Sequence, residues 1–307
     1  MPDYDLIVIG SGLAGLTAGL FSARQGLSTL VVESNLPGGH LMNIEKIEDF
    51  PGFPDGVSGY ELCPNLQRQA SDYGAELQRA EVQRLEPQDK SWLVATEEET
   101  HRAKAVIVAT GSTLKHLNVP GEERLIGRGV SHCASCDGPL YNGKTVGVVG
   151  GGDSALQEAL TLANFAEKVL VFNQTEAFSS QQTYQQKAAA NEKILPRHNV
   201  AVAEVLGEDV VTGVRLRDLG SATIDQVGLA GLFIYIGLQP NTSLLRDLVA
   251  LSESGHVPTD VSMKTERAGL YAAGDVRQNS ASQAITSAGD GATAAIAAYR
   301  YIKKNFR

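Results

Sequence analysis

Residues 5–33 read DLIVIGSGLAGLTAGLFSARQGLSTLVVE. An apolar, strand-like run enters a glycine-rich turn, a segment with helical periodicity follows, and a second apolar run ends at Glu33. This order is the βαβ unit whose Gly-x-Gly-x-x-Gly turn binds dinucleotides, here Gly10, Gly12 and Gly15. The first two glycines make the tight turn and admit a pyrophosphate, and the third lets helix and strand pack closely. The phosphates are then expected at the positive end of the helix.

The same pattern recurs at residues 144–173, KTVGVVGGGDSALQEALTLANFAEKVLVFN. Its turn reads Gly150-x-Gly152-x-x-Ala155. One glycine fingerprint is weak evidence, but two copies, each placed between a strand pattern and a helix pattern, are strong evidence. The sequence therefore predicts an α/β fold with two Rossmann-like, three-layer ββα domains.

The remaining segments predict how the two domains are connected. Residues 80–108 alternate apolar and polar positions, which indicates an antiparallel meander returning to the first sheet. Residues 112–118 and 237–242 are typical of linkers, and residues 270–298 indicate a strand, a loop and a helix rich in small residues. We therefore expect the second domain, 114–239, to be inserted into the first, which consists of 1–113 and 240–307.

The composition restricts the class of protein. Of 307 residues, 43% are hydrophobic and 20% charged, as in globular enzymes. The net charge of −9 argues against a nucleic-acid partner, because phosphate binding needs a basic surface. No apolar run approaches the ~18 residues of a membrane span, and the start MPDYDLIVIG lacks the features of a signal peptide. We expect a cytoplasmic protein that does not bind membranes.

The chain has three cysteines, two of which form a C-x-x-C pair in Cys133-Ala-Ser-Cys136. In a reducing compartment such a pair is typical of redox chemistry or metal binding. Zinc would need four ligands, and neither a second C-x-x-C nor a paired histidine motif is present, with His132 and His198 isolated in sequence. We therefore expect no metal site, and we expect Cys63 to be a buried core thiol.

Eight motifs occur in the order found in low-molecular-weight thioredoxin reductases, namely GSGLAG, PGGH, DFPGF, ATG, CASCDG, GGGDSA, AAGDV and QAITSAGDG. The chain resembles this family over essentially its whole length. The resemblance implies a homodimeric flavoprotein with a split FAD domain and an inserted nucleotide domain that carries a redox-active disulfide. It also implies a rotation between the two domains.

By this resemblance the FAD site draws on several parts of the first domain. Glu33, 23 residues after Gly10, would accept hydrogen bonds from the ribose hydroxyls, although a solvated charge at a strand end is the alternative. Family members usually have Gln at the position of His40 and Arg at that of Ser282. The residues implied to bind FAD are Gly10, Ser11, Gly12, Ala14, Gly15, Glu33, Gly38, Gly39, His40, Asp49, Val82, Thr110, Gly111, Gly274, Asp275, Gln283 and Ala284.

The resemblance also assigns roles around the cysteine pair. Cys136 would face the flavin, Cys133 would attack a thioredoxin-like protein disulfide, and Asp137 would protonate the departing thiolate. A carboxyl group can do this at neutral pH only if burial or the nearby thiolate raises its pKa. His132 is expected in a loop, where a cation beside Cys133 could lower the pKa of that thiol.

The second turn lacks the usual phosphate clamp. Glu33 follows Gly10 by 23 residues, and the same spacing counted from Gly150 ends at Asn173. An NADH site favours an acidic residue at this position, whereas an NADPH site favours a nearby Arg. Residues 172–182, FNQTEAFSSQQ, hold no cation, and no Arg occurs from 129 to 196, whereas NADPH-dependent family members read HRRxxxRA here. We therefore expect a donor other than NADPH, as in the ferredoxin-linked and diflavin-linked members that the chain resembles. Two ligands remain possible for this second site: NADH, whose ribose it would bind weakly, or a second FAD. The site is formed by Gly150, Gly152, Asp153, Ser154, Asn173 and Gln174.

Two further questions stay open at this level. The tail YRYIKKNFR (299–307) carries Arg300, Lys303, Lys304 and Arg307, which could dock ferredoxin or another acidic carrier, or could be a solvated helix end. Rival functions are a flavin reductase or oxidase that does not use the cysteines, a redox sensor with a regulatory disulfide, and a weak NADH-dependent thioredoxin reductase.

Overall fold

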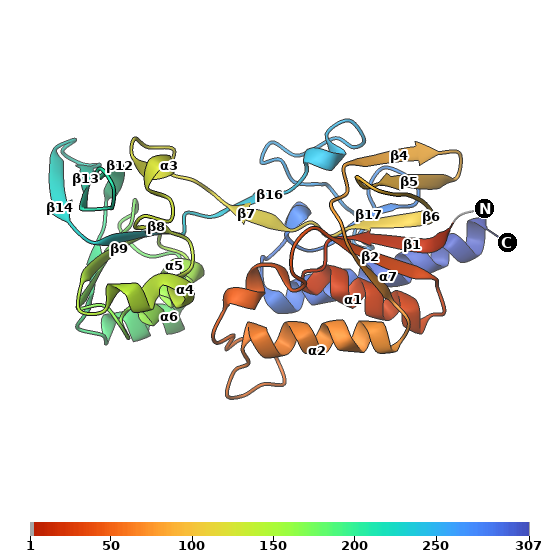
Figure 1. Cartoon of the computed structure of the whole chain (residues 1–307), viewed down its shortest axis with the longest axis horizontal. Coiled ribbons are helices and arrows are strands. Elements are labelled where there is room, and N and C mark those ends of the chain that lie inside the picture. The colour runs from red at the N-terminus through yellow and green to blue at the C-terminus, as the bar shows by residue number, and fades with distance from the viewer. Residues whose placement is uncertain (1–2, 307) are drawn as a thin grey trace. The chain divides into compact units, whose positions relative to one another are not determined.

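The computed structural model describes residues 3–306 and divides the chain into two compact units (Figure 1). The first unit comprises Met1–Thr113 and Gln239–Arg307, and the second comprises Leu114–Leu238. Both units are built around a largely parallel sheet with helices, so the predicted α/β fold class is confirmed.

The first unit contains a seven-stranded sheet in the order β3-β2-β1-β6-β5-β4, with β17 beside β6. Strands β1, β2, β3, β6 and β17 are parallel, and β4 and β5 form the predicted antiparallel meander with β6. The strands are β1 (Tyr4–Ile9), β2 (Thr29–Glu33), β3 (Glu76–Arg79), β4 (Arg84–Gln88), β5 (Ser91–Ala95), β6 (Thr100–Val108) and β17 (Leu270–Ala272). The helices are α1 (Leu13–Arg24), α2 (Gly59–Asp72) and α7 (Ala284–Asn305), with 3-10 turns η1 (Gly39–Asn43), η3 (Ser243–Leu245) and η4 (Gly274–Val276).

Strand β1 has a buried layer on each of its faces. Leu6 and Val8 pack in one hydrophobic cluster with α1 and α7, while Ile7 and Ile9 pack in another with residues of β4 and β5. This is the two-residue alternation of a strand buried on both sides. The small residues of α7 let it lie against α1, since a Cβ on Gly291 would come within 2.0 Å of the Ala14 carbonyl oxygen.

The second unit contains a five-stranded parallel sheet in the order β11-β10-β9-β15-β8. One core cluster joins this sheet to the helices, and another joins it to a three-stranded antiparallel sheet. The parallel strands are β8 (Val130–Ser131), β9 (Thr145–Val149), β10 (Lys168–Phe172), β11 (Ile194–Arg197) and β15 (Gly231–Ile234), and the antiparallel ones are β12 (Val200–Leu206), β13 (Gly213–Asp218) and β14 (Ile224–Gly228). The helices are α3 (Glu122–Leu125), α4 (Ala134–Asp137), α5 (Asp153–Leu162) and α6 (Gln182–Ala189), with the 3-10 turn η2 (Gly138–Tyr141).

Two short strands, β7 (Ser112–Leu114) and β16 (Leu238–Pro240), pair where the chain passes between the units. The segments expected to be plain linkers therefore contain a two-stranded ribbon, extended by the hydrogen bond from Lys115 N to Gly237 O at 3.0 Å. Residues far apart in sequence make this pairing, which is why local composition did not indicate it.

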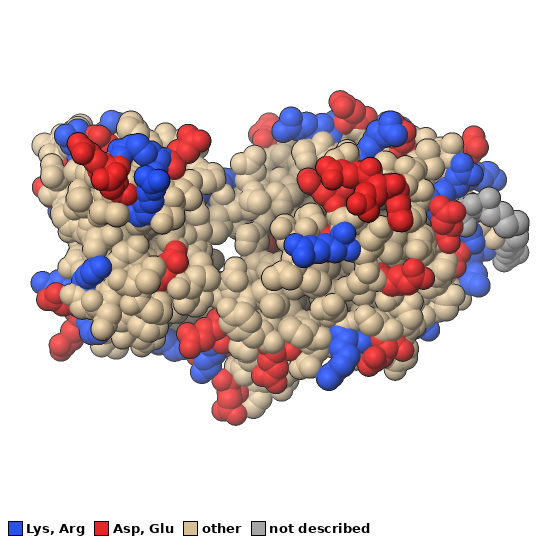
Figure 2. Space-filling model, in the orientation of Figure 1, with Lys and Arg blue, Asp and Glu red and all other residues tan. Residues whose placement is uncertain are grey.

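Charges of both signs are interspersed on the face shown in Figure 2. In the C-terminal helix the Lys303 ammonium lies 5.5 Å from the centre of the Tyr299 ring. Arg307, part of the predicted basic tail, lies outside the described residues. Within residues 3–306, no helix is long and apolar enough to cross a membrane.

Candidate active site and nucleotide-binding turns

The first glycine turn has the geometry of a phosphate-binding turn. Gly10 has φ +100°, and a Cβ there would come within 2.3 Å of the Ala109 carbonyl oxygen, so only glycine fits. Gly12 caps α1 without a side-chain hydrogen bond, and a Cβ at this position would meet no described atom within 4 Å. The N-terminal amides of a 12-residue helix therefore start beside open space, as anion binding requires.

Glu33 is the last residue of β2 and accepts hydrogen bonds from this turn. Its Oε2 accepts hydrogen bonds from the backbone N–H of Ser11 at 2.7 Å and from its hydroxyl at 2.8 Å, and its Oε1 accepts from Asn35 N at 2.9 Å. The carboxylate is thus fixed at the edge of the turn rather than freely solvated. The Ser34 hydroxyl is a fourth donor, to Oε1 at 3.4 Å, and this longest of the four hydrogen bonds is the one that a ribose hydroxyl would replace most easily.

The segment at Gly38 and Gly39 lies against the same turn. Gly38 N donates to Ser11 O at 2.8 Å, and a Cβ on Gly39 would lie 3.5 Å from the Gly12 Cα. Cys63 lies beneath this segment, 1% exposed, with its thiol 3.7 Å from Gly38 O. The expectation of a buried core thiol is therefore confirmed, and this burial raises the pKa of Cys63 to about 11.

A polar chain continues from His40 to Asp275. The Nε2 atom of His40 lies 2.6 Å from Ser112 O, and the Ser112 hydroxyl donates to Asp275 at 3.3 Å. Asp275 also accepts hydrogen bonds from the hydroxyls of Ser280 and Ser287 at 3.4 and 3.3 Å. Gly274 comes close to α1, because a Cβ there would lie 3.0 Å from the Ala14 Cβ.

The other residues predicted for FAD have varied surroundings. Asp49 is exposed in the loop before α2, and Val82 packs on the core beside β4. Thr110 Oγ1 donates to Asn241 O at 2.8 Å, and Gly111 O accepts from Asn241 N at 3.0 Å. Gln283 caps α7 in a capping box, and Ala284 is the first residue of that helix.

Sequence reasoning did not predict the buried ion pair of Asp290 and Arg277. The Arg277 guanidinium donates to Asp290 through Nε at 2.5 Å and through Nη2 at 3.0 Å, and Gly274 N donates to the same carboxylate at 3.2 Å. The pair therefore fixes the loop that carries Asp275. Asp290 is the acid of the QAITSAGDG motif, and that motif was the one available signal.

The second glycine turn repeats the geometry of the first. Gly150 has φ +136°, with the Tyr235 carbonyl oxygen 2.1 Å from where a Cβ would lie. Gly152 caps α5 without a side-chain hydrogen bond, and the nearest atom to a Cβ there would be Ser179 Oγ at 4.0 Å. The ten-residue helix α5 thus begins beside open space as α1 does.

The stretch after β10 folds back onto this turn. Ser179 N and Ser180 N donate to Gly151 O at 2.9 and 3.1 Å, and Gln181 donates to Asp153 through its backbone N at 2.7 Å and its side chain at 2.9 Å. Gln174 and Ser154 are exposed beside these residues.

Asn173, predicted to lie at the ribose position, is buried, and its amide nitrogen contacts its own loop and, at 3.2 Å, Nδ1 of His198. Its Nδ2 donates to Thr175 O at 3.1 Å and to Ala177 O at 2.9 Å. One Arg does reach this end of the sheet, since Arg197 is the register partner of Phe172, but its guanidinium pairs with Asp225 at 3.2 Å. The described loop therefore presents neither an acid at position 173 nor an unpaired Arg.

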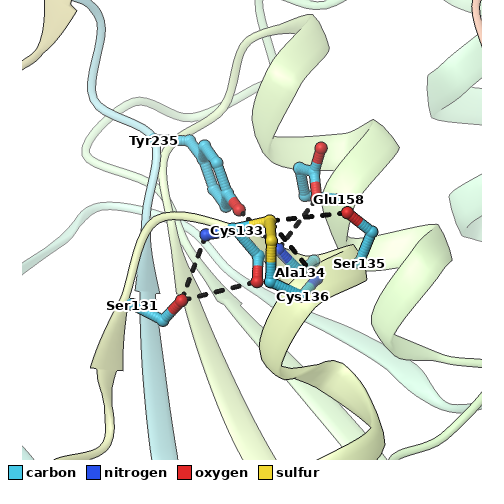
Figure 3. Close-up of a disulfide and its surroundings, with 7 residues drawn as sticks. All are labelled: Ser131, Cys133, Ala134, Ser135, Cys136, Glu158 and Tyr235. Atoms are coloured by element: carbon cyan, nitrogen blue, oxygen red, sulfur yellow. Dashed lines mark hydrogen bonds between the residues drawn. A yellow bond between two sulfur atoms is a disulfide. The ribbon is translucent and has the colours of Figure 1, made fainter. Parts of the chain in front are cut away.

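Cys133 and Cys136 form a disulfide at the start of α4 (Figure 3). The Cys133 sulfur accepts the Cys136 backbone N–H at 3.2 Å and lies 3.4 Å from the Ser135 hydroxyl. Cys133 is half-buried, whereas Cys136 is exposed. Asp137 ends the helix, and its backbone N donates to Cys133 O at 3.1 Å.

Two residues that the sequence did not predict fix this helix. Ala134 N donates to both Glu158 Oε2 and the Tyr235 hydroxyl, each at 3.2 Å (Figure 3). Glu158 belongs to α5, so the helix that begins at the second glycine turn also contacts the disulfide segment. Burial and then the Glu158 charge raise the pKa of Tyr235. No local motif could have found these residues, because both contacts form only through tertiary packing.

His132 and His198, which are isolated in sequence, each have an aromatic partner in the structure. The ring centres of His132 and His116 are 5.5 Å apart, and the His198 ring lies 4.7 Å from that of Phe178. Both contacts join residues that are distant in sequence.

Comparison with known proteins identifies the family of this chain. The family model described as pyridine nucleotide-disulphide oxidoreductase matches residues 4–291. The chain is 40% identical over 300 residues to a thioredoxin reductase of Mycolicibacterium smegmatis, covering 97% of this chain and 96% of the relative. The crystal structure of Lactococcus lactis thioredoxin reductase superposes with a TM-score of 0.96 at 35% identity, covering 98% of this chain and all of that one. A ferredoxin-flavin thioredoxin reductase structure from Clostridium acetobutylicum gives a TM-score of 0.54 at 27% identity, covering 98% and 99%. The chain therefore belongs to the thioredoxin reductase family of disulfide oxidoreductases.

Proposed function

We propose that this protein is an FAD-dependent protein-disulfide reductase that passes electrons through Cys133 and Cys136 to a thioredoxin-like disulfide. The observation that carries the proposal is the Cys133–Cys136 disulfide, in which Cys136 is exposed and Cys133 is half-buried. It lies on the unit that also holds the second glycine turn, while the first turn lies on the other unit. Thioredoxin as the substrate follows the names of the relatives. A homodimer is proposed on the family resemblance alone.

The first unit fits FAD by the shape and charge of its turn. The open space at Gly12 and the uncapped start of α1 suit a pyrophosphate, and Glu33 suits ribose hydroxyls. Ser112 and Asp275 would hydrogen-bond the polar chain that joins ribose and flavin. FAD supplies the two-electron chemistry that reduces the disulfide.

The cysteines then act by thiol–disulfide exchange. Two electrons and two protons convert the Cys133–Cys136 disulfide to two thiols. The Cys133 thiolate attacks the substrate disulfide and forms a mixed disulfide, and one substrate thiolate leaves. Cys136 next attacks Cys133, restores the internal disulfide and releases the second substrate thiol.

The surroundings of Cys133 support its role as the attacking sulfur. The Cys136 N–H and the Ser135 hydroxyl both lie within hydrogen-bond reach of this sulfur and would stabilise its thiolate. Asp137, at the other end of the short helix, is the proposed proton donor to the leaving thiolate. Glu158 and Tyr235 would hold the helix in position for these steps.

The donor that we propose is not NADPH. The 2′-phosphate of NADPH needs cations, and the described loop 173–181 offers none, while Arg197 is paired with Asp225. The intact turn at Gly150 and Gly152 can still take a nucleotide without that phosphate, either a second FAD or NADH. Ferredoxin is the other proposed donor, with the basic residues of the C-terminal tail as its docking cations.

Flavin content and substrate turnover test the proposal together. We expect the purified protein to hold FAD and to reduce thioredoxin with a photoreduced ferredoxin system, but only slowly with NADPH. Two FAD per chain would support a second flavin at the Gly150 turn, whereas one FAD and no fast reduction by NADPH or NADH would favour ferredoxin. Rapid flavin reduction by micromolar NADPH would contradict the proposed donor. Unchanged turnover in Cys136→Ser would contradict the disulfide pathway.

A further inference from the structure

Three side chains able to ligate a metal lie together in the second unit. They are His116 after β7, Glu122 at the start of α3, and His132 after β8. One ligand atom from each lies within 4.8 Å of the others. Their spacing along the chain matches no local metal motif, so only the fold reveals the group.

His132 has the hydrogen bonding of a metal ligand. Its Nδ1 lies 3.1 Å from Ile234 O, and a carbonyl oxygen only accepts, so Nδ1 carries the proton. The lone pair then resides on Nε2, which is buried and has no hydrogen-bond partner within residues 3–306. A buried acceptor without a partner is costly. Metal-bound histidines typically donate their second nitrogen to a carbonyl in this way.

Glu122 supplies a fixed negative charge at the same place. It is 3% exposed, and its carboxylate accepts from Leu117 N at 3.0 Å and from Asn118 N at 2.6 Å. Its Oε1 also lies 3.2 Å from Nδ1 of His116, whose side chain is 53% exposed. A turn-stabilising role for Glu122 accounts for the backbone contacts but not for the unpartnered nitrogen of His132.

We propose that His116, Glu122 and His132 bind a divalent transition-metal cation, for which Zn²⁺ is the best match. One of the three ligands, His132, immediately precedes Cys133 in the sequence. Two imidazoles and one carboxylate are a ligand set of zinc sites that keep a fourth position for water. Magnesium and calcium prefer oxygen ligands alone, so they match this set poorly.

The geometry allows closure around the ion without refolding. Bonds of about 2.1 Å at tetrahedral angles place ligand atoms about 3.4 Å apart. The widest pair must therefore approach by roughly 1.4 Å from the 4.8 Å limit. His116 Nδ1 is already 3.2 Å from Glu122 Oε1, and the exposed His116 ring can rotate to adjust its own distances to the ion. The same exposed ring gives the ion an entry path from solvent.

The test is a Zn²⁺ titration of the oxidised full-length protein against a chromophoric chelator, since the closed disulfide keeps the thiols from competing. We expect one Zn²⁺ per chain. His116→Gln and His132→Gln should each weaken binding about tenfold or more, because one of three ligands is lost. His256→Gln, in the other unit, should bind as the wild type does. The exposed position of His116 makes its variant the less disruptive of the two.

X-ray absorption at the zinc edge provides the second readout. We expect imidazole nitrogen and oxygen ligands and no sulfur. The proposal would be overturned by sulfur ligation, by binding only at millimolar Zn²⁺, or by equal affinity in the wild type and both His variants.

Discussion

The loop after β10 allows the nucleotide preference to be tested by restoring the missing cations. Gln174 and Ser179 are exposed, and Ser179 is anchored by its backbone to Gly151 at the second glycine turn. The hydroxyl of Ser179 is also the nearest atom to the open side of Gly152. The double variant Gln174→Arg/Ser179→Arg would therefore place two guanidinium groups beside the turn.

The size of the expected effect follows from this exposure. Hydrogen bonds to charged groups contribute about 1.5–3 kcal/mol, and solvent screening at exposed positions reduces this to roughly 1 kcal/mol for each Arg. Two such contacts amount to about 2 kcal/mol, or roughly 30-fold in a ratio of dissociation constants. Because only NADP⁺ carries the 2′-phosphate, the change should fall on the ratio of NADP⁺ to NAD⁺ binding.

Isothermal titration calorimetry of both nucleotides measures this ratio directly. We expect the wild type not to favour NADP⁺, and we expect the double variant to shift the ratio about 30-fold toward NADP⁺. Gln226→Arg is the control, because it adds one positive charge at an exposed position on β14 and should not alter the ratio. Tighter NADP⁺ than NAD⁺ binding in the wild type, or an unchanged ratio in the double variant, would refute the reasoning.

Three further predictions concern the first unit. Gly12→Ala should fold normally, because its Cβ meets no described atom within 4 Å, yet it should retain less FAD after desalting because the methyl group fills the phosphate position. Asp290→Ala should lower the free energy of unfolding in urea by about 3–5 kcal/mol, because it leaves the Arg277 charge buried without its partner. Cys63 should not react with a thiol reagent at pH 8, where a pKa of about 11 leaves roughly one thiolate per thousand, so the reduced native protein should show two reactive thiols and the unfolded protein three. The neutral Cys63 thiol contributes stability that is complete below its ordinary pKa of 9.0 and is lost as the pH rises through about 11.

Matched comparisons make these predictions specific. Asp225→Ala breaks the exposed pair with Arg197 and should cost less than about 1 kcal/mol, so an equal loss from Asp290→Ala would contradict the buried-pair argument. Full FAD retention by Gly12→Ala would show that the phosphates do not approach this position. A third thiol that reacts in the native protein would show that Cys63 is accessible.

The sequence correctly predicted features that depend on the pattern of neighbouring residues. Both glycine turns stand between a strand and a helix, and the alternation of Leu6, Ile7, Val8 and Ile9 across β1 follows from the two-residue strand period. Cys63 was also predicted to be a buried core thiol, and it is 1% exposed. Each of these predictions depends on neighbours within a few residues along the chain.

The contacts that were missed join residues without any common local pattern. Glu158 of α5 and Tyr235, the residue after β15, both contact Ala134, and the ring of His116 lies beside that of His132. Asn173 occupies the position that the repeat predicted, but hydrogen bonds within its loop determine the direction of its amide. Such side-chain directions are set by tertiary packing, which spacing alone does not give.

In the proposed function, electrons leave the flavin through the Cys133–Cys136 disulfide. The most direct measurement starts with anaerobic photoreduction of the purified flavoprotein, which makes the result independent of the natural donor. Oxidised thioredoxin is then added, and the thiols formed on it are counted in wild type and Cys136→Ser. We expect two new thioredoxin thiols for each electron pair in the wild type, and in the variant a mixed disulfide with Cys133 but no release of fully reduced thioredoxin. Equal transfer in Cys136→Ser would contradict the proposed pathway.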